Sequence, residues 1–186
     1  MEALDALLNR VSVPRLVEPA PTAAQREVLF QAALRAPDHG QLRPWRFLTV
    51  EGQALTHLGQ VLADAVQLKG DATEAALDKA RNMPLRAPLV IVVIARLQDH
   101  GKVPKSEQLL AAGCAAHGIL LAAHAQGIGA VWRTGELSYA PYVADKLGLG
   151  EGEGVIGFLY LGTPAKDLRA APELDTADFV QAWPVV

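Results

Sequence analysis

The sequence predicts an α+β fold, a three-layer α/β/α sandwich in which a mixed central sheet carries helices on both faces. Two observations support this prediction. Segments with helical hydrophobic spacing alternate with short apolar runs along the 186 residues. One of these runs, residues 89–95, is apolar throughout, which is typical of a strand buried on both faces. A sheet that contains such a strand needs helices on both sides to cover it.

The first half of the chain is predicted to be mostly helical. The expected elements are a helix at 3–10 with Leu4, Leu7 and Leu8 on one face, a helix from 22 to 35, a strand at 46–50 and a helix at 55–66. Thr22 is a favourable N-cap for the second helix. Residues 69–83 are polar and rich in alanine, with a break at Gly70-Asp71. We expect them to form a mobile helical excursion that covers a cleft.

The second half contains the longest predicted helix. The expected elements are a strand at 88–95, a helix at 105–126, a strand at 128–133, a short helix at 142–147, a strand at 154–162 and an extended tail. Residues 109–128 reach the length of a membrane span, about 20 residues. They include His117 and His124 and many alanines, so we predict a helix buried inside the protein. Its small residues, with Cys114 expected to be buried, permit close packing on a copy of itself or on its own sheet.

Composition limits the classes of function. The length and the 51% hydrophobic content fit a single globular domain spanning 1–186. A net charge of −3 argues against a nucleic-acid partner, and a single cysteine excludes an intrachain disulfide and a cysteine-based zinc site. The mean hydropathy of +0.17 suggests apolar surface covered by a second subunit. The acidic N-terminus lacks the pattern of a signal peptide, so we expect a cytoplasmic protein.

Standard catalytic motifs are missing. The chain has neither a phosphate-binding Gly-x-x-x-x-Gly-Lys-Ser/Thr loop nor a Gly-x-Ser-x-Gly elbow. The glycines at 148, 150, 152 and 154 are interleaved with glutamates, so we interpret them as a surface turn. His117 and His124 have no neighbouring carboxylate in the sequence, and we expect no metal site.

Three polar segments border apolar elements without an obvious structural reason. They are Arg10 with Ser12, the loop within residues 33–50, and Trp132 with Arg133. Arg10 has two interpretations, a cation at a helix C-terminus or an anion contact. Together the segments offer cations, an aromatic plane and backbone donors. These groups suit a flat ligand that carries a phosphate.

The same segments carry a resemblance that extends over nearly the whole chain. The matching residues are Asn9-Arg-Val-Ser12 with Arg15, Glu18-Pro-Ala-Pro-Thr22, Arg35-Ala-Pro-Asp-His-Gly40, Arg43-Pro-Trp-Arg-Phe47, Lys79-Ala-Arg-Asn82, Arg86-Ala-Pro-Leu-Val90, Ala125-Gln-Gly-Ile-Gly129, Trp132-Arg-Thr-Gly135 and Gly157-Phe-Leu-Tyr-Leu-Gly-Thr-Pro164. In this order they resemble the nitroreductase family of flavin enzymes, in its minimal short-chain bacterial branch.

The resemblance implies an intertwined homodimer that binds FMN at the subunit interface, with a tail from about residue 165 extending over the partner. The FMN contacts it implies are Arg10, Val11, Ser12, Val131, Trp132 and Arg133 from one subunit, with Arg35 and His39 from the other. A nicotinamide contact is implied at Leu121, Ala122, Ala123, His124, Ala125 and Gln126. Lys166 or Arg169 is a candidate for the FMN phosphate. Val11 replaces a basic residue that the family usually has, so we expect backbone contacts there.

The implied activity is two-electron, ping-pong transfer. NAD(P)H would reduce FMN, and a nitroaromatic or quinone acceptor would then be reduced by the flavin, which carries the chemistry. Two alternatives stay open at this point. One is a flavin-binding protein of the same fold with a dedicated substrate that is not a nitro compound, and the other is an interaction dimer without a cofactor.

Overall fold

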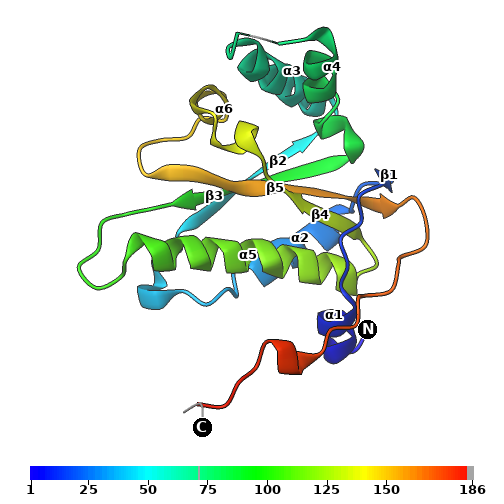
Figure 1. Ribbon diagram of the computed structural model, residues 1–186, viewed down its shortest axis with the longest axis vertical. Helices are drawn as coiled ribbons and strands as arrows, with labels where there is room; N and C mark the ends of the chain where they lie inside the picture. Colours follow the sequence, from blue (N-terminus) through cyan, green and yellow to red (C-terminus); the bar gives the residue numbers. More distant parts are fainter. Residues whose placement is uncertain (71, 184–186) are drawn as a thin grey trace.

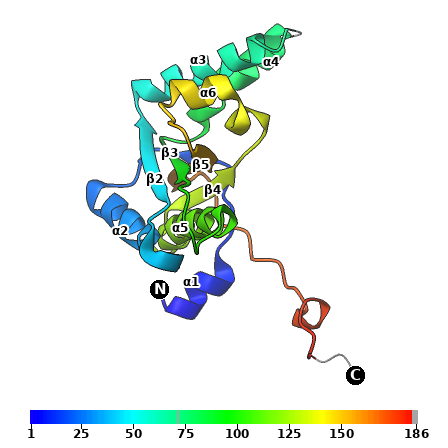
Figure 2. The same ribbon diagram turned by 90° about the vertical axis from the view of Figure 1, so that its left-hand side faces the viewer.

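The computed structural model describes residues 1–70 and 72–183 and confirms the three-layer α+β fold (Figures 1 and 2). One face of the sheet carries α3 (Gln53–Gln67), α4 (Glu74–Arg81) and α6 (Pro141–Lys146), and the other carries α2 (Ala23–Ala33) and α5 (Lys105–Ala125). A short α1 (Ala3–Asn9) lies beside α5. The predicted break at Gly70-Asp71 cannot be compared in full, because Asp71 lies outside the described residues.

The sheet has five strands in the order β1-β5-β3-β2, and β4 also pairs with β5. The strands are β1 (Leu16–Val17), β2 (Trp45–Glu51), β3 (Leu89–Arg96), β4 (Gly129–Arg133) and β5 (Glu153–Pro164). Among the described residues every strand pair is antiparallel, so the prediction of a mixed sheet was wrong. The crossover through α5 does join two parallel strands, β3 and β4. The last strand, β5, inserts between them and runs opposite to both.

Strand β3 divides the core into two parts, because its side chains alternate between the faces of the sheet. Val90, Val92 and Ile94 belong to the cluster beneath α3 and α6. Leu89, Ile91, Val93 and Ala95 belong to the cluster with α2 and α5. Every residue from Leu89 to Ala95 is fully buried. The prediction of a strand covered on both faces is therefore confirmed.

Helix α5 is buried on one side only. Its inner face packs on the sheet and on α2, and Gly118 lies against the α2 backbone, where a Cβ atom would come within 2.9 Å of the Ala32 carbonyl oxygen. The outer face contains Leu110 and His117, and Cys114 is exposed, contrary to our expectation. The sequence run does not distinguish the two sides, because it is small and apolar all round. By length and composition α5 passes as a membrane span, but 44% of its apolar window is buried inside the protein.

Two terminal segments leave apolar side chains uncovered in the single chain. Helix α1 forms as predicted, but Leu4, Leu7 and Leu8 are 68%, 55% and 72% exposed. Beyond Pro164 the tail runs away from the sandwich (Figures 1 and 2), and its large apolar side chains, Leu168, Leu174, Phe179, Val180 and Trp183, are exposed. The last three residues of the predicted tail lie outside the described part of the chain.

Candidate functional site

Two cavities border the end of β4 and share Arg133. The smaller, about 370 Å³, is formed by the segment after α1, by β4 and by the start of the tail; its lining includes Val11, Ser12, Arg15, Val131, Lys166 and Arg169. The larger, about 670 Å³, lies between α3, α4 and the turn after β4; its lining includes Lys69, Lys79, Arg86, Trp132, Glu136 and Tyr160. Five of the eight predicted FMN contacts, namely Val11, Ser12, Val131, Trp132 and Arg133, therefore line this pair of cavities.

Local hydrogen bonds bring the two predicted FMN segments together. The backbone N–H of Val13 donates to the carbonyl oxygen of Ala130 over 2.9 Å, which lays the segment after α1 along β4. On its other edge β4 pairs with β5, with Val131 opposite Tyr160 and Trp132 opposite Leu159. A Cβ atom at Gly157 would lie only 2.1 Å from the Trp132 indole nitrogen, so glycine makes room for that ring.

Arg133 is the only described residue that lines both cavities. Its guanidinium carbon lies 5.7 Å from the centroid of the Tyr160 ring, a cation–π contact. Its Nε atom is buried and has no hydrogen-bond partner among the described residues. Buried donors are almost always satisfied in native proteins, so an orphaned guanidinium nitrogen beside two cavities indicates a missing ligand group.

Arg86 reaches the same place from the turn before β3. Burial raises the pKa of the Tyr160 phenol, while the nearby charges of Arg133 and Arg86 lower it. Both guanidinium groups therefore lie close to this phenol. The sequence placed Trp132 and Arg133 at the site but gave no role to Lys79, Arg86 or Tyr160. Their signal was the resemblance itself, because all three belong to its matching segments.

Arg10 lies at the base of this region without lining either cavity. It is close enough to His124 that its charge adds to burial in lowering the pKa of the imidazole. His124 is 8% exposed, and its Nε2 atom has no partner within residues 1–70 and 72–183. Two orphaned nitrogens, on His124 and Arg133, thus border the segment that holds Arg10.

His39 lies at the opposite end of α5, whereas Arg35 follows α2, whose residue Ala32 lies beside Gly118 in the middle of α5. The Nδ1 atom of His39 is 2.6 Å from the Glu107 carboxylate, in the first turn of α5, whereas His124 lies in the last turn. Seventeen residues of helix separate Glu107 from His124, about 25 Å at 1.5 Å per residue. A single chain therefore keeps His39 far from the cavities that Arg133 joins, and neither His39 nor Arg35 is among the described residues that line them.

Contacts made by the loop's own residues fix the conformation of the segment that holds His39. The Asp38 carboxylate accepts a 2.7 Å hydrogen bond from the backbone N–H of Arg43. Gly40, Gln41 and Arg43 have positive φ angles, which are uncommon for residues other than glycine. Trp45 then enters the core between the sheet and α5. Asp38 and Trp45, which had no predicted role, fix the shape of this loop.

The predicted nicotinamide segment is partly enclosed, with Ala123 and His124 buried and Ala125 exposed. Ala123 is fully buried, and the Gln126 amide donates to the carbonyl oxygens of Gln25 and Ala122. Of the segment, only Gln126 lines one of the described cavities, a separate one of about 160 Å³. The nicotinamide assignment stays a prediction.

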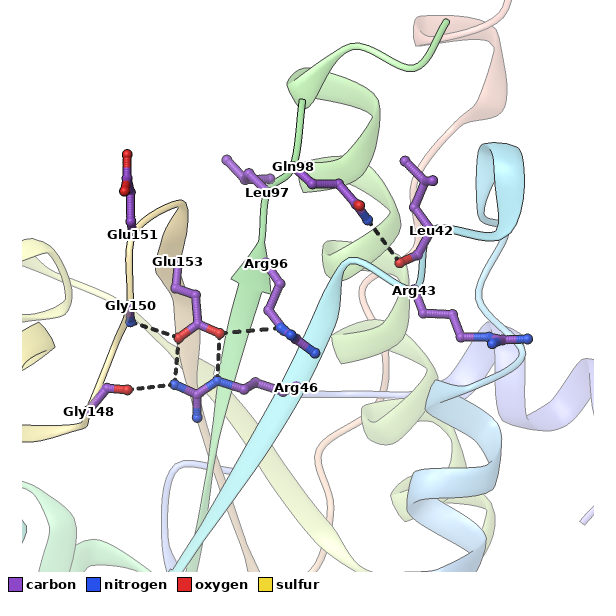
Figure 3. A pocket seen from close by; sticks show the side chains of 10 residues that line it. All are labelled: Leu42, Arg43, Arg46, Arg96, Leu97, Gln98, Gly148, Gly150, Glu151 and Glu153. Atoms are coloured by element: carbon purple, nitrogen blue, oxygen red, sulfur yellow. Dashed lines mark hydrogen bonds and ion pairs between the residues drawn. The ribbon is translucent and has the colours of Figure 1, made fainter. Parts of the chain in front are cut away.

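Another cleft, about 690 Å³, lies at the other end of the sheet, where Arg46 and Arg96 meet Glu153 (Figure 3). Here Arg46 grips the Glu153 carboxylate through two nitrogens, at 2.8 and 2.6 Å, and Arg96 approaches it at 3.4 Å. These contacts, led by the hydrogen bond from Arg46, lower the pKa of Glu153 to about 2. The charge of Arg46 is therefore already balanced by Glu153 and is not available to an anionic ligand.

Comparison with known proteins identifies the family. A sequence model described as "Nitroreductase family" matches residues 7–163. The chain belongs to the nitroreductase family. It is 43% identical over 178 residues, 96% of each chain, to the Escherichia coli K12 protein named "Putative NAD(P)H nitroreductase YdjA".

Two solved structures share the fold of this nitroreductase-family chain. A nitroreductase-like family protein from Bacillus cereus has a TM-score of 0.83 at 22% identity, covering 98% of this chain and 96% of that one. A mutant of NfnB from "sphigopyxis sp. strain HMH", an FMN and NADPH-dependent nitroreductase, has a TM-score of 0.77 at 17% identity, covering 99% and 100%. At these identities the similarity establishes the fold alone. The sequence-based recognition of the family is confirmed.

Proposed function

We propose that this protein is an FMN-dependent NAD(P)H oxidoreductase that passes two electrons to a nitroaromatic or quinone acceptor by a ping-pong cycle. The observation that carries the proposal is the buried, unpartnered Nε of Arg133, placed where two cavities meet beside the predicted FMN segments. The relationship to YdjA over 96% of both chains supports NAD(P)H as the reductant. The FMN dependence of NfnB supports the choice of flavin.

The residues present fit FMN. The smaller cavity carries Arg15, Arg133, Lys166 and Arg169 against one carboxylate, Asp167, and so suits a phosphate. Backbone groups of residues 11–12 and 131–133 border the space between the cavities, where they would orient the ring. When bound, FMN supplies the hydride chemistry, and the chain supplies position, charge and exclusion of water.

The proposal includes a homodimer whose two subunits share each site. His39 lies about 25 Å along α5 from the Arg10 region, so we assign it, together with Arg35 at the start of the same loop, to the flavin of a second chain. The exposed leucines of α1, the outer face of α5 and the apolar tail provide surface for that second chain. Soluble proteins rarely leave apolar surface of this extent uncovered. We propose that the tail crosses the partner.

The visible spectrum and one variant test this function. Purified protein should show a flavin spectrum that NADH or NADPH bleaches without an acceptor and that an added quinone restores. Arg10→Ala should weaken FMN binding by about 1.5–3 kcal/mol, the value of a charge-assisted contact, and should change turnover per bound flavin less. Arg81→Ala, on the exposed face of α4, is the control.

Three results would redirect the proposal. Colourless protein that takes up no FMN would favour a cofactor-free interaction dimer. Bound flavin that neither nucleotide bleaches would favour a flavin protein with a dedicated substrate. Equal FMN affinity in Arg10→Ala and the wild-type protein would remove Arg10 from the site.

A further inference from the structure

The larger cavity combines an apolar interior with unpaired cations. Its walls include Leu62, Val66, Ala80, Met83, Leu137 and Phe158, and its aromatic side chains are Trp132 and Tyr160. Four cations also line it: Lys69, Lys79, Arg86 and Arg133. Among the described residues Glu136 is the only acidic one in its lining, and that carboxylate forms an ion pair with Lys69. The remaining three cations have no carboxylate partner among residues 1–70 and 72–183.

The phosphate of the flavin does not account for these cations. The smaller cavity already offers Arg15, Lys166 and Arg169 for a phosphate, whereas Lys79 and Arg86 line only the larger one. Lys79 projects from α4, and Arg86 lies in the turn between α4 and β3, close to the Tyr160 phenol. An ammonium and two guanidinium groups, from Lys79, Arg86 and Arg133, therefore line one space that also has aromatic walls.

We propose that this cavity selects a planar aromatic acceptor that carries a negative charge, a carboxylate or a phosphate, and that Lys79 and Arg86 recognise that group. This inference rests on the proposed oxidoreductase function and names the class of its substrate. The aromatic body of the acceptor lies against Trp132 and the apolar wall. Its anion lies between Lys79 and Arg86, where a guanidinium group can make two parallel hydrogen bonds to it.

A matched pair of acceptors tests the proposal. 4-Nitrobenzoate and 4-nitrobenzamide have nearly the same shape and differ in charge. We expect kcat/KM to favour the benzoate by about tenfold or more in the wild-type enzyme. Lys79→Met and Arg86→Met should each lower that ratio by about tenfold, and about 0.5 M salt should lower it in the wild-type enzyme. Lys102→Met, an exposed lysine in the loop before α5, should leave the ratio unchanged.

Equilibrium binding provides a measurement that needs no turnover. Benzoate should bind the purified holoprotein more tightly than benzamide by calorimetry, and Arg86→Met should remove the difference. Equal affinities, or a benzoate preference that survives in both variants, would overturn the proposal. Failure of the proposed oxidoreductase function would show itself in a different measurement, because NAD(P)H would then not bleach the flavin even before an acceptor is added. If the two cations act only on the flavin, its reduction potential changes in the variants while the benzoate to benzamide ratio does not, and that result also overturns the proposal.

Discussion

The two ends of the central sheet use arginine in opposite ways. At one end Arg46 and Arg96 converge on Glu153, a carboxylate that is itself nearly buried and balances one of their two charges (Figure 3). At the other end Arg133 and Arg86 approach Tyr160, and within the described residues no carboxylate pairs with either. Arg133 is half-buried and Arg86 is exposed, so their charges remain free to bind an anionic group. The paired cluster stabilises the fold, whereas the unpaired one is available to a ligand.

We expect the largest effect from removing Arg46, because it pairs with Glu153 and the loss changes the stability of the fold. Arg46→Met leaves Glu153 largely buried with only the more distant Arg96, so we expect the free energy of unfolding to fall by about 3 kcal/mol. Urea denaturation at fixed protein concentration measures this change. FMN affinity should not change, because Arg46 is remote from the cavities at β4.

A second ion pair serves as the control for that variant. Arg26 also bonds its partner through two nitrogens, at 2.8 and 2.7 Å, but the Glu51 carboxylate is 48% exposed. Arg26→Met should cost no more than about 1 kcal/mol, as is usual for surface pairs. Equal losses in the two variants would show that burial of the carboxylate does not set the strength of these pairs.

A fall in pH should remove the contribution of the Glu153 ion pair to the stability of the fold. The folded-state pKa of Glu153, about 2, lies below its usual 4.5. Its contribution is therefore complete above pH 4.5 and is lost as the pH falls toward 2. By linkage, about 2 kcal/mol should disappear between pH 6 and pH 3. The stability difference between wild type and Glu153→Gln, measured by urea denaturation at both values, should shrink by this amount.

A change at Arg133, which has no carboxylate partner among the described residues, should affect FMN binding and not stability. Arg133→Met removes the orphaned donor and should weaken FMN binding by at least about 1.5 kcal/mol, more than tenfold in Kd. Fluorescence titration of apoprotein with FMN measures it. Stability of the flavin-free protein should stay the same or rise, since an unsatisfied buried nitrogen is lost. A large fall in apoprotein stability would mean that Arg133 supports the fold.

Much of the fold follows from local sequence signals. The apolar run of β3 and the Thr22 cap, whose side chain forms a capping box with Gln25, were predictable because both depend on neighbouring residues. The antiparallel sheet was not, because the position of β5 between β3 and β4 depends on pairing between residues far apart in the chain. The two-residue strand β1 is too short for any periodic pattern to appear.

The site, like the fold, was predictable only in the parts that depend on neighbouring residues. The sequence grouped residues 10–12 with 131–133, and the structure brings all of them except Arg10 to the two cavities. The convergence of Arg86 on Tyr160 could not be read from the sequence, because they are 74 positions apart and only the pairing of β3 with β5 brings them together. The exposure of Cys114 was missed for a similar reason, since α5 is apolar on both sides and only packing distinguishes its faces.

The distance between His39 and the Arg10 region along α5 has a genetic consequence. If each flavin is held by Arg10 of one chain and Arg35 of the other, two proteins with weakened flavin sites can complement one another. In a mixed dimer of one Arg10→Ala chain and one Arg35→Ala chain, one site contains both substitutions. The other site contains neither, because it takes Arg10 and Arg35 from the chains in which they are intact. Cells that express both variants should therefore contain dimers with one fully intact site, although neither variant alone makes any.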